Sequence, residues 1–181
     1  MLLDTPICEF GWKAAEFTLK DPDGQAYTMS EQLGDKGLLI AFICNHCPYV
    51  QAIADRLDSD AKQLQDEGIN VLAVMSNNYQ TVSEDSPPNM KRFAEAHGFT
   101  FPYLVDEDQS VGRAYGAVCT PDFFGFNKDG ELQYRGRLDD AKMGSPANRN
   151  RELVEAMGQI AETGQGPTQQ VASMGCSIKW S

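Results

Sequence analysis

The clearest pattern in the chain is a pair of apolar runs separated by a segment with helical spacing. Residues 38–43 are apolar at every position, which predicts a central strand covered on both faces. From residue 50 to 64, apolar side chains recur on one helical face, with Pro48 suited to the first helical position and Gly68 to the end. Residues 69–75 form the second apolar run. A strand, a helix and a strand with short joins predict two parallel strands.

Alternating and periodic segments on both sides extend this unit. Each of two predicted hairpins has an Asp-Gly turn between two short alternating runs. A polar loop separates the second apolar run from the next helix, and it is long enough to be functional or mobile. The remaining predicted elements are a hairpin over 17–28, a helical turn over 30–33, the polar loop over 76–88, a helix from Pro87 to His97, a strand over 101–105, a short helix capped by Asp108, a hairpin over 123–135 and a last helix over 147–163.

The length of the chain fits one domain followed by a short tail. With 181 residues, the chain can enclose one sizeable core. We place that domain at residues 1–163. Residues 164–170 are rich in Gly, Gln and Pro and predict a linker, so residues 164–181 form a C-terminal tail that carries Gly-Cys-Ser-Ile-Lys-Trp.

The charge balance is strongly acidic. The chain has 15 Lys and Arg residues against 26 Asp and Glu residues, a formal net charge of -11. Nucleic-acid backbones and anionic membranes need basic patches, so we expect neither as a partner. The first six residues lack the features of a signal peptide, and no apolar run approaches the roughly 18 residues of a transmembrane helix. We therefore expect a cytoplasmic location, where a Cys-x-x-Cys pair is catalytic or metal-binding rather than structural.

The candidate chemistry lies in Cys44-Asn45-His46-Cys47-Pro48, between the first predicted strand and its helix. A thiolate is the reactive form of cysteine, and the N-terminus of a helix favours an anion. Cys47 stands at the N-cap position, whereas Cys44 lies further back on the loop, so Cys47 is the predicted nucleophile. Cys44 would then be the resolving thiol. His46 either assists a neighbouring thiol or is simply solvated at the start of the helix.

Several motifs together resemble a known family. Over residues 6–163 the chain is similar to the thioredoxin-like superfamily, and most closely to the peroxiredoxin-like group of the alkyl hydroperoxide reductase/thiol-specific antioxidant (AhpC/TSA) family. Members of that group look similar at the Cys-Asn-His-Cys-Pro turn and at the Gly-Cys-x-Ile-Lys-Trp tail. The resemblance implies an α/β thioredoxin-like fold with a central mixed sheet flanked by helices, an N-terminal β-hairpin and a peroxiredoxin-type insertion. The other motifs that carry it are Phe17-Thr18-Leu19 to Asp23-Gly24, Phe101 to Asp106 with Ala114-Tyr115-Gly116, and Thr120-Pro121.

The register of this resemblance also favours Cys47. Counted without gaps from the end of the strand, Cys47 takes the place of the first thioredoxin cysteine and of the peroxidatic cysteine of peroxiredoxins. The peroxiredoxin signature would place Pro at position 40 and Thr at position 44, where this chain has Ile40 and Cys44. The peroxiredoxin arginine falls near position 121, where this chain has Pro121. Those missing groups hold and polarise the peroxide O–O bond, so the resemblance favours disulfide exchange over peroxide reduction.

Four residues are candidates for supporting roles at this centre. Thr120 and Pro121 resemble the cis-proline motif that packs against the active cysteine and pairs with the substrate backbone. His46 and Pro48 flank Cys47 in the turn. The arginines that follow in the chain are most simply surface charges, although one near Cys47 could replace the missing peroxiredoxin arginine; they are Arg113, Arg135 and Arg137.

Two further cysteines are candidate resolving thiols. Cys176 lies in the tail, which either is flexible and brings this thiol to the site or is anchored through Ile178 and Trp180. Cys119 either faces Cys47 or is a small buried apolar side chain. A zinc site needs four ligands, and we assign no metal residues, while copper(I) or a labile zinc at the turn is a competing interpretation.

The predicted function is that of a cofactor-free thiol-disulfide oxidoreductase that cycles through Cys47, with Cys44 as the resolving thiol. Its substrate would be a protein disulfide or a small peroxide, and a thioredoxin-type reductant would recycle it. The first alternative is a peroxiredoxin that reduces hydrogen peroxide or alkyl hydroperoxides. The second is a metal-binding or chaperone-like protein without turnover. The sequence leaves the oligomeric state open, with a dimer as one option.

Overall fold

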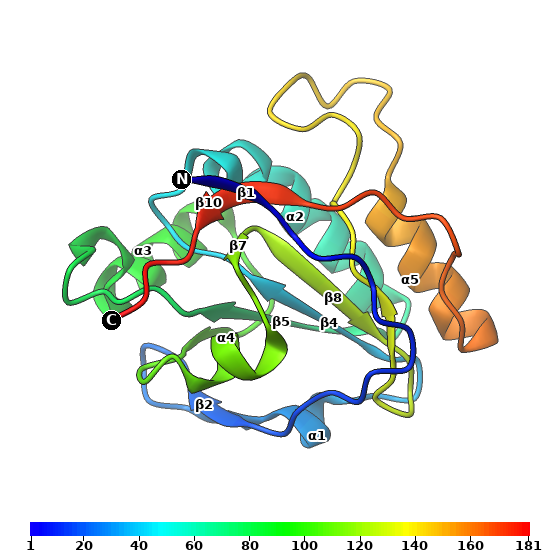
Figure 1. Cartoon of the computed structure of the whole chain (residues 1–181), viewed down its shortest axis with the longest axis horizontal. Helices are drawn as coiled ribbons and strands as arrows, with labels where there is room; N and C mark the ends of the chain where they lie inside the picture. Colours follow the sequence, from blue (N-terminus) through cyan, green and yellow to red (C-terminus); the bar gives the residue numbers. More distant parts are fainter.

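Two β-sheets organise the chain in the computed structural model, which describes residues 1–181 (Figure 1). The larger sheet has seven strands in the order β3-β2-β6-β5-β4-β8-β9, and the smaller has three in the order β1-β10-β7. The strands are β1 Leu2–Asp4, β2 Thr18–Lys20, β3 Ala26–Thr28, β4 Leu38–Phe42, β5 Asn70–Met75, β6 Tyr103–Val105, β7 Cys119–Thr120, β8 Asp122–Phe126, β9 Leu132–Tyr134 and β10 Met174–Ser177. The helices are α1 Met29–Gln32, α2 Pro48–Asp66, α3 Pro87–His97, α4 Ser110–Tyr115 and α5 Glu152–Thr163, with a 3₁₀ turn at Ser83–Asp85.

The apolar runs form the two central strands. β4 pairs in parallel with β5, with Leu38 opposite Asn70, and antiparallel with β8. Every residue of β4 is buried, as the run without a polar position predicted. α2 connects the two parallel strands and begins at Pro48, with Cys47 as its N-cap residue. The predicted strand–helix–strand unit is therefore confirmed.

Helices cover both faces of the large sheet (Figure 1). One face packs against α2, α3 and α5 through buried side chains that include Leu57, Met90 and Met157. The other face packs against α4 and the segment before β2, where Tyr115 meets the ring of Trp12 edge-on. The sheet thus has an apolar layer on each side. None of the helices combines the length and the apolar composition that a membrane span requires.

The last helix begins later than its apolar spacing predicted. α5 starts at Glu152 instead of residue 147, because the preceding segment is held by ion pairs in an irregular path. Arg149 and Arg151 both bind the buried carboxylate of Asp60 on α2, at 2.6 and 2.7 Å. Asn148 has a positive φ of 60°, which a helix does not allow. Both hairpins and the helix after the polar loop form as predicted.

The expectation that Arg135 is a surface charge is wrong. Its side chain is only 8% exposed and binds the fully buried carboxylate of Asp122 at 2.7 Å. Its guanidinium also donates to the carbonyl oxygen of Gly116 and lies 4.3 Å from the centre of the Phe124 ring. This arginine therefore joins the start of β8 to β9 and to the end of α4.

Replacing Arg135 with alanine should destabilise the fold. The Asp122 carboxylate would stay buried without its cation, and breaking such a pair costs about 3–5 kcal/mol. Burial already raises the pKa of Asp122 to about 6, so the folded state holds this proton more tightly than the unfolded chain does. Arg135 opposes that rise, so its removal should move the pKa of Asp122 further above 6. The loss should therefore be largest at alkaline pH and should shrink as the pH falls toward 6, because below that pH Asp122 is protonated in both proteins.

Urea unfolding of Arg135→Ala at two pH values measures this effect. Lys128→Ala, at an exposed position of the same hairpin, is the control and should change little. A loss below about 1 kcal/mol at neutral pH would contradict a structural role for the pair.

Candidate active site

Both thiols of the turn contact the same residue of β7, Thr120. The chain leaves β4 at Phe42, and the following segment carries Cys44 and Cys47 to the start of α2. The Sγ atom of Cys44 lies 3.4 Å from the hydroxyl oxygen of Thr120, and the Sγ atom of Cys47 lies 3.4 Å from the carbonyl oxygen of the same residue. Neither thiol has a solvent-exposed surface of more than 1%. The predicted cis peptide bond between Thr120 and Pro121 is confirmed.

The environment pushes the pKa values of the two thiols in opposite directions. The pKa of Cys47 is lowered to about 4, chiefly by a hydrogen bond from the Cys44 thiol and also by Cys176 and the backbone N–H of Val50, against the opposing effect of burial. The same hydrogen bond, with burial and the nearby Asp85 carboxylate, raises the pKa of Cys44 well above its ordinary value. In this arrangement Cys47 is the thiolate and Cys44 remains protonated. This supports the prediction that Cys47 is the nucleophile.

Asp85 holds the turn in place, and sequence reasoning missed it. One carboxylate oxygen accepts the backbone N–H groups of Asn45 and His46, at 2.7 and 3.2 Å. The other accepts Nδ1 of His46 at 2.6 Å and Nδ2 of Asn77 at 2.9 Å. The residue is fully buried although it lies in the polar loop before α3. The unusual length of that loop was the only signal in the sequence.

Asn45 links this carboxylate to the sheet. Its side chain donates to the carbonyl oxygen of Glu84 at 2.9 Å and accepts the hydroxyl of Tyr103 at 2.9 Å. Its own carbonyl oxygen accepts Nε2 of Gln51 on α2. The residue between the two cysteines is thus tied to the polar loop, to β6 and to α2, which fixes the spacing of the thiols.

The tail brings a third thiol to the same place. β10 is paired with β7, with Cys176 opposite Thr120, and this places Cys176 where it lowers the pKa of Cys47. Burial and the nearby Cys47 raise the pKa of Cys176 to about 11. Ile178 is buried, and the ring of Trp180 lies 4.4 Å from the guanidinium carbon of Arg113, so the tail is anchored on the body. Of the two interpretations of the tail, the structure supports the anchored one, and it still delivers Cys176.

Cys119 has a different environment from the other three thiols. It is fully buried on β7, and burial with the nearby Asp122 carboxylate raises its pKa to about 12. This residue therefore fits the interpretation of a small buried side chain better than that of a resolving thiol.

Three ligand-type atoms also gather at the turn. Sγ of Cys44, Nδ1 of His46 and a carboxylate oxygen of Asp85 lie within 4.8 Å of one another. These are ligand types that zinc accepts. Metal binding would require Cys44 to lose its proton beside a carboxylate, and both oxygens of Asp85 already accept two hydrogen bonds each. The arrangement of these three residues therefore fits the hydrogen-bonded turn better than a metal site.

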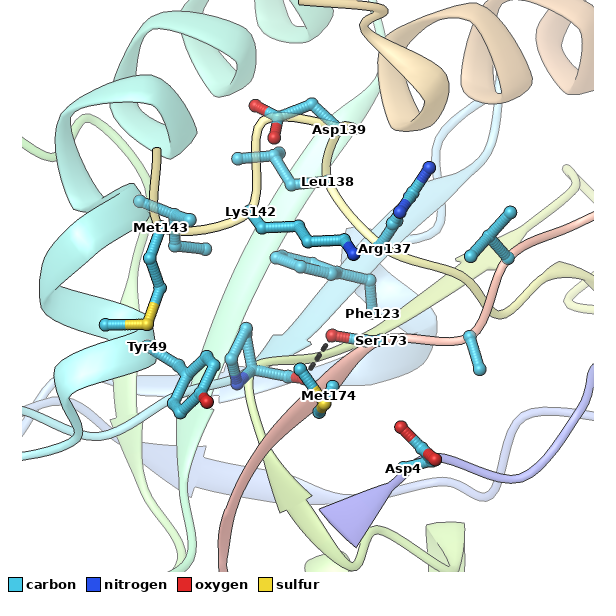
Figure 2. Close-up of a pocket in the computed structure, with 14 residues that line it drawn as sticks. Asp4, Tyr49, Phe123, Arg137, Leu138, Asp139, Lys142, Met143, Ser173 and Met174 are labelled. Atoms are coloured by element: carbon cyan, nitrogen blue, oxygen red, sulfur yellow. Dashed lines mark hydrogen bonds between the residues drawn. The ribbon is translucent and has the colours of Figure 1, made fainter. Parts of the chain in front are cut away.

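A pocket opens beside the tail on the Pro121 side of the thiols. It has a volume of about 230 Å³ and is lined by residues that include Tyr49, Pro121 and Met174. Figure 2 shows Tyr49 and Met174 close together at one end and the side chains of Lys142 and Arg137 further along. The dashed line in Figure 2 is the hydrogen bond from the Ser173 hydroxyl to the carbonyl oxygen of Pro121, which ties the tail to the pocket wall.

Replacing Asp85 with alanine should loosen the turn and destabilise the protein. Two buried backbone N–H groups would lose their acceptor, and each hydrogen bond to a charged group is worth about 1.5–3 kcal/mol. Urea unfolding should show a loss of about 3 kcal/mol or more for Asp85→Ala and a smaller loss for Asp85→Asn, which keeps one acceptor oxygen. Glu84→Ala is the matched control, because that neighbouring side chain is exposed. Equal stability of Asp85→Ala and Glu84→Ala would contradict this role.

Comparison with known proteins places the chain in a family. The sequence matches the AhpC/TSA family over residues 10–135, which is more than half of the chain. An uncharacterized conserved protein from Geobacillus kaustophilus, of known structure, is 37% identical with a TM-score of 0.94, and the match covers 100% of this chain and 97% of that one.

Two named relatives differ in the reaction that their names describe. A thiol-disulfide oxidoreductase named ResA from Halalkalibacterium halodurans is 25% identical, over 71% of this chain and 69% of its own length. A peroxiredoxin named Bcp from Escherichia coli K12 is 28% identical, over 65% of this chain and 70% of its own length. The predicted thioredoxin-like α/β fold is confirmed, and this chain belongs to the AhpC/TSA family.

Proposed function

We propose that this protein is a thiol-disulfide oxidoreductase in which Cys47 is the nucleophile and Cys44 the resolving thiol. The observation that carries the proposal is the position of Cys47 as the N-cap residue of α2, beside Cys44 and Cys176, which both lower its pKa. A low pKa makes the thiolate available at neutral pH and makes Cys47 a good leaving group. The family and the names of both relatives indicate thiol-based redox chemistry.

The reaction balances in two exchange steps. The Cys47 thiolate attacks one sulfur of a substrate disulfide and expels the other as a thiolate, which leaves a mixed disulfide on Cys47. The Cys44 thiol then loses its proton and attacks Sγ of Cys47, so that the second substrate thiolate leaves and a Cys44–Cys47 bond forms. A thioredoxin-type dithiol restores the reduced pair by the reverse exchange.

The hydrogen-bonded pair of Asp85 and His46 lies close to Cys44. A ring nitrogen of His46 and a carboxylate oxygen of Asp85 lie within 4.8 Å of Sγ of Cys44. We propose that this pair accepts the proton that Cys44 releases when it attacks Cys47. Cys176 is the second candidate for the resolving step, since it also contacts Cys47.

Peroxide reduction is the second candidate function, and one observation favours it. Cys47 has no exposed surface, so a small oxidant reaches it more readily than a large one. Peroxide would oxidise the thiolate to a sulfenic acid, and a second thiol would then displace water to form the disulfide. Arg135 is committed to Asp122, and position 121, where peroxiredoxins have their arginine, is Pro121.

A metal-binding protein without turnover is the candidate from another class. The cluster of Cys44, His46 and Asp85 is the observation that favours it. Stoichiometric zinc or copper after purification, without any redox turnover, would support that function against ours. The cytoplasmic location and the oligomeric state stay predictions from the sequence.

Turnover of the purified protein separates these functions. With dithiothreitol as reductant, Cys47→Ser should lose essentially all reduction of bis(2-hydroxyethyl) disulfide, while Cys8→Ser, outside the thiol cluster, should keep it. Stopped-flow oxidation by hydrogen peroxide should be slow for a disulfide exchanger and fast for a peroxiredoxin. Turnover of either substrate by Cys47→Ser would disprove the mechanism.

The thiolate of Cys47 should be visible in a pH titration. Its ultraviolet absorbance should appear near pH 4 and persist to alkaline pH, because the folded state lowers this pKa from 9.0 to about 4. The thiolate therefore stabilises the folded state at high pH, and this contribution is lost as the pH falls toward 4. Cys44→Ala, which removes the first donor, should shift the transition upward, and Cys44→Ser, which keeps an O–H donor, should shift it less. A titration that is the same in both variants and the wild type would contradict the role of Cys44.

A further inference from the structure

The C-terminal strand occupies the strand edge beside the thiols. β10 pairs antiparallel with β7, with Cys176 opposite Thr120 and Ser177 opposite Cys119. On its other side, β10 pairs with β1, where Leu2 stands opposite Cys176. In Figure 1 this strand lies beside the N-terminal strand and passes over the beginning of α2. The backbone edge next to Cys47 is therefore already paired with a segment of the same chain.

The approach of this strand to Thr120 is too close for any residue but glycine. A Cβ atom at Gly175 would overlap the carbonyl oxygen of Thr120, which also contacts Cys47. Hydrogen bonds fix the strand on both sides of that contact. The Ser173 hydroxyl donates to Pro121 at 2.7 Å, and the backbone N–H of Ile178 donates to the carbonyl oxygen of residue 118 at 2.9 Å.

The strand also presents a sulfur to the nucleophile. The Cys176 side chain and its backbone N–H both lower the pKa of Cys47. Cys47 has no exposed surface under this cover, whereas Cys176 is partly exposed. A polypeptide that is recognised by strand addition pairs its backbone with a free edge and directs alternate side chains into the site. β10 supplies both the paired backbone and the sulfur.

We infer that β10 is a tethered substitute for a polypeptide substrate: while it is docked the centre takes small, non-peptide oxidants, and a protein partner, a thioredoxin-type reductant included, must first displace it. The inference rests on the proposed function and specifies its substrate class. An extended protein disulfide would have to displace β10, which a short tether holds at an effective concentration in the millimolar range. The pocket beside the strand, lined in part by Pro121 and Met174, has a volume of about 230 Å³, which is smaller than the roughly 300–1,000 Å³ of typical ligand pockets and too small for an extended polypeptide.

A glycine substitution tests this without removing any thiol. Gly175→Ala adds the Cβ that overlaps Thr120 and should displace β10, and Gly175→Val should do so more strongly. Gly158→Ala on α5 is the matched control, because a Cβ there meets no atom within 4 Å. The two probes are bis(2-hydroxyethyl) disulfide as the small substrate and insulin as the protein disulfide, and amide hydrogen exchange of residues 174–177 reports whether the strand is docked.

Wild type and Gly158→Ala should reduce the small disulfide and should reduce insulin slowly. Gly175→Ala should raise the ratio of the insulin rate to the small-disulfide rate by about tenfold, part of the advantage that the tether gives β10. Cys176→Ser keeps the strand and should keep insulin excluded. An unchanged ratio in both Gly175 variants, with the strand amides exchanging freely, would overturn the inference, as would a Cys176→Ser variant that admits insulin. Wild type that reduces neither substrate would instead refute the proposed function, and the inference with it.

Discussion

A negative charge without any exposed surface, at the start of α2, is the constraint on which the rest of the site depends. Burial by itself disfavours a thiolate, so the charge on Cys47 is stable only where the protein supplies donors. The groups that lower its pKa are the helix N-terminus, Cys44 and Cys176. These groups belong to segments at opposite ends of the chain. The central strand β4, the short strand β7 and the tail must therefore all be in place before the thiolate is stable.

The carboxylate of Asp85 adds to the hydrogen bond and to burial in keeping the charge off Cys44. The carboxylate of Asp85 lies beside Cys44 and repels a negative charge there, while Cys47 has the helix N-terminus. Cys44 consequently stays protonated, and its S–H group donates the hydrogen bond that stabilises the Cys47 thiolate. The same carboxylate accepts the backbone N–H groups of the turn, so one residue sets both the geometry and the charge distribution. The difference between the two thiols is thus built into the turn and does not depend on a ligand.

Much of this could be predicted from the sequence, because the relevant signals are local. The apolar runs, the helical spacing after Pro48 and the turn residues of both hairpins each lie within about twenty residues, and all of them formed the expected elements. Cys47 could be singled out for the same reason, since its position at a helix start follows from Pro48 next to it. The cis peptide bond before Pro121 followed from a motif in the family resemblance rather than from its own surroundings.

The features that escaped prediction all depend on contacts between distant segments. Nothing near Asp85 shows that its carboxylate points back to a turn 40 residues earlier. Arg135 has the composition of a surface residue and becomes buried only because Asp122 lies on the neighbouring strand. The late start of α5 has the same origin, because two arginines before it are held by Asp60 on α2.

The tail shows how one contact can serve two properties at once. The strand that carries Cys176, which lowers the pKa of Cys47, is also the strand that closes the edge beside it. If β10 moved away, Cys47 would become accessible and would lose the effect of Cys176 that lowers its pKa. Access and the stability of the thiolate are therefore coupled through a single short strand. If Cys47 is the nucleophile, as we propose, its thiolate is most stable under the strand, where a small oxidant reaches it and an extended polypeptide does not.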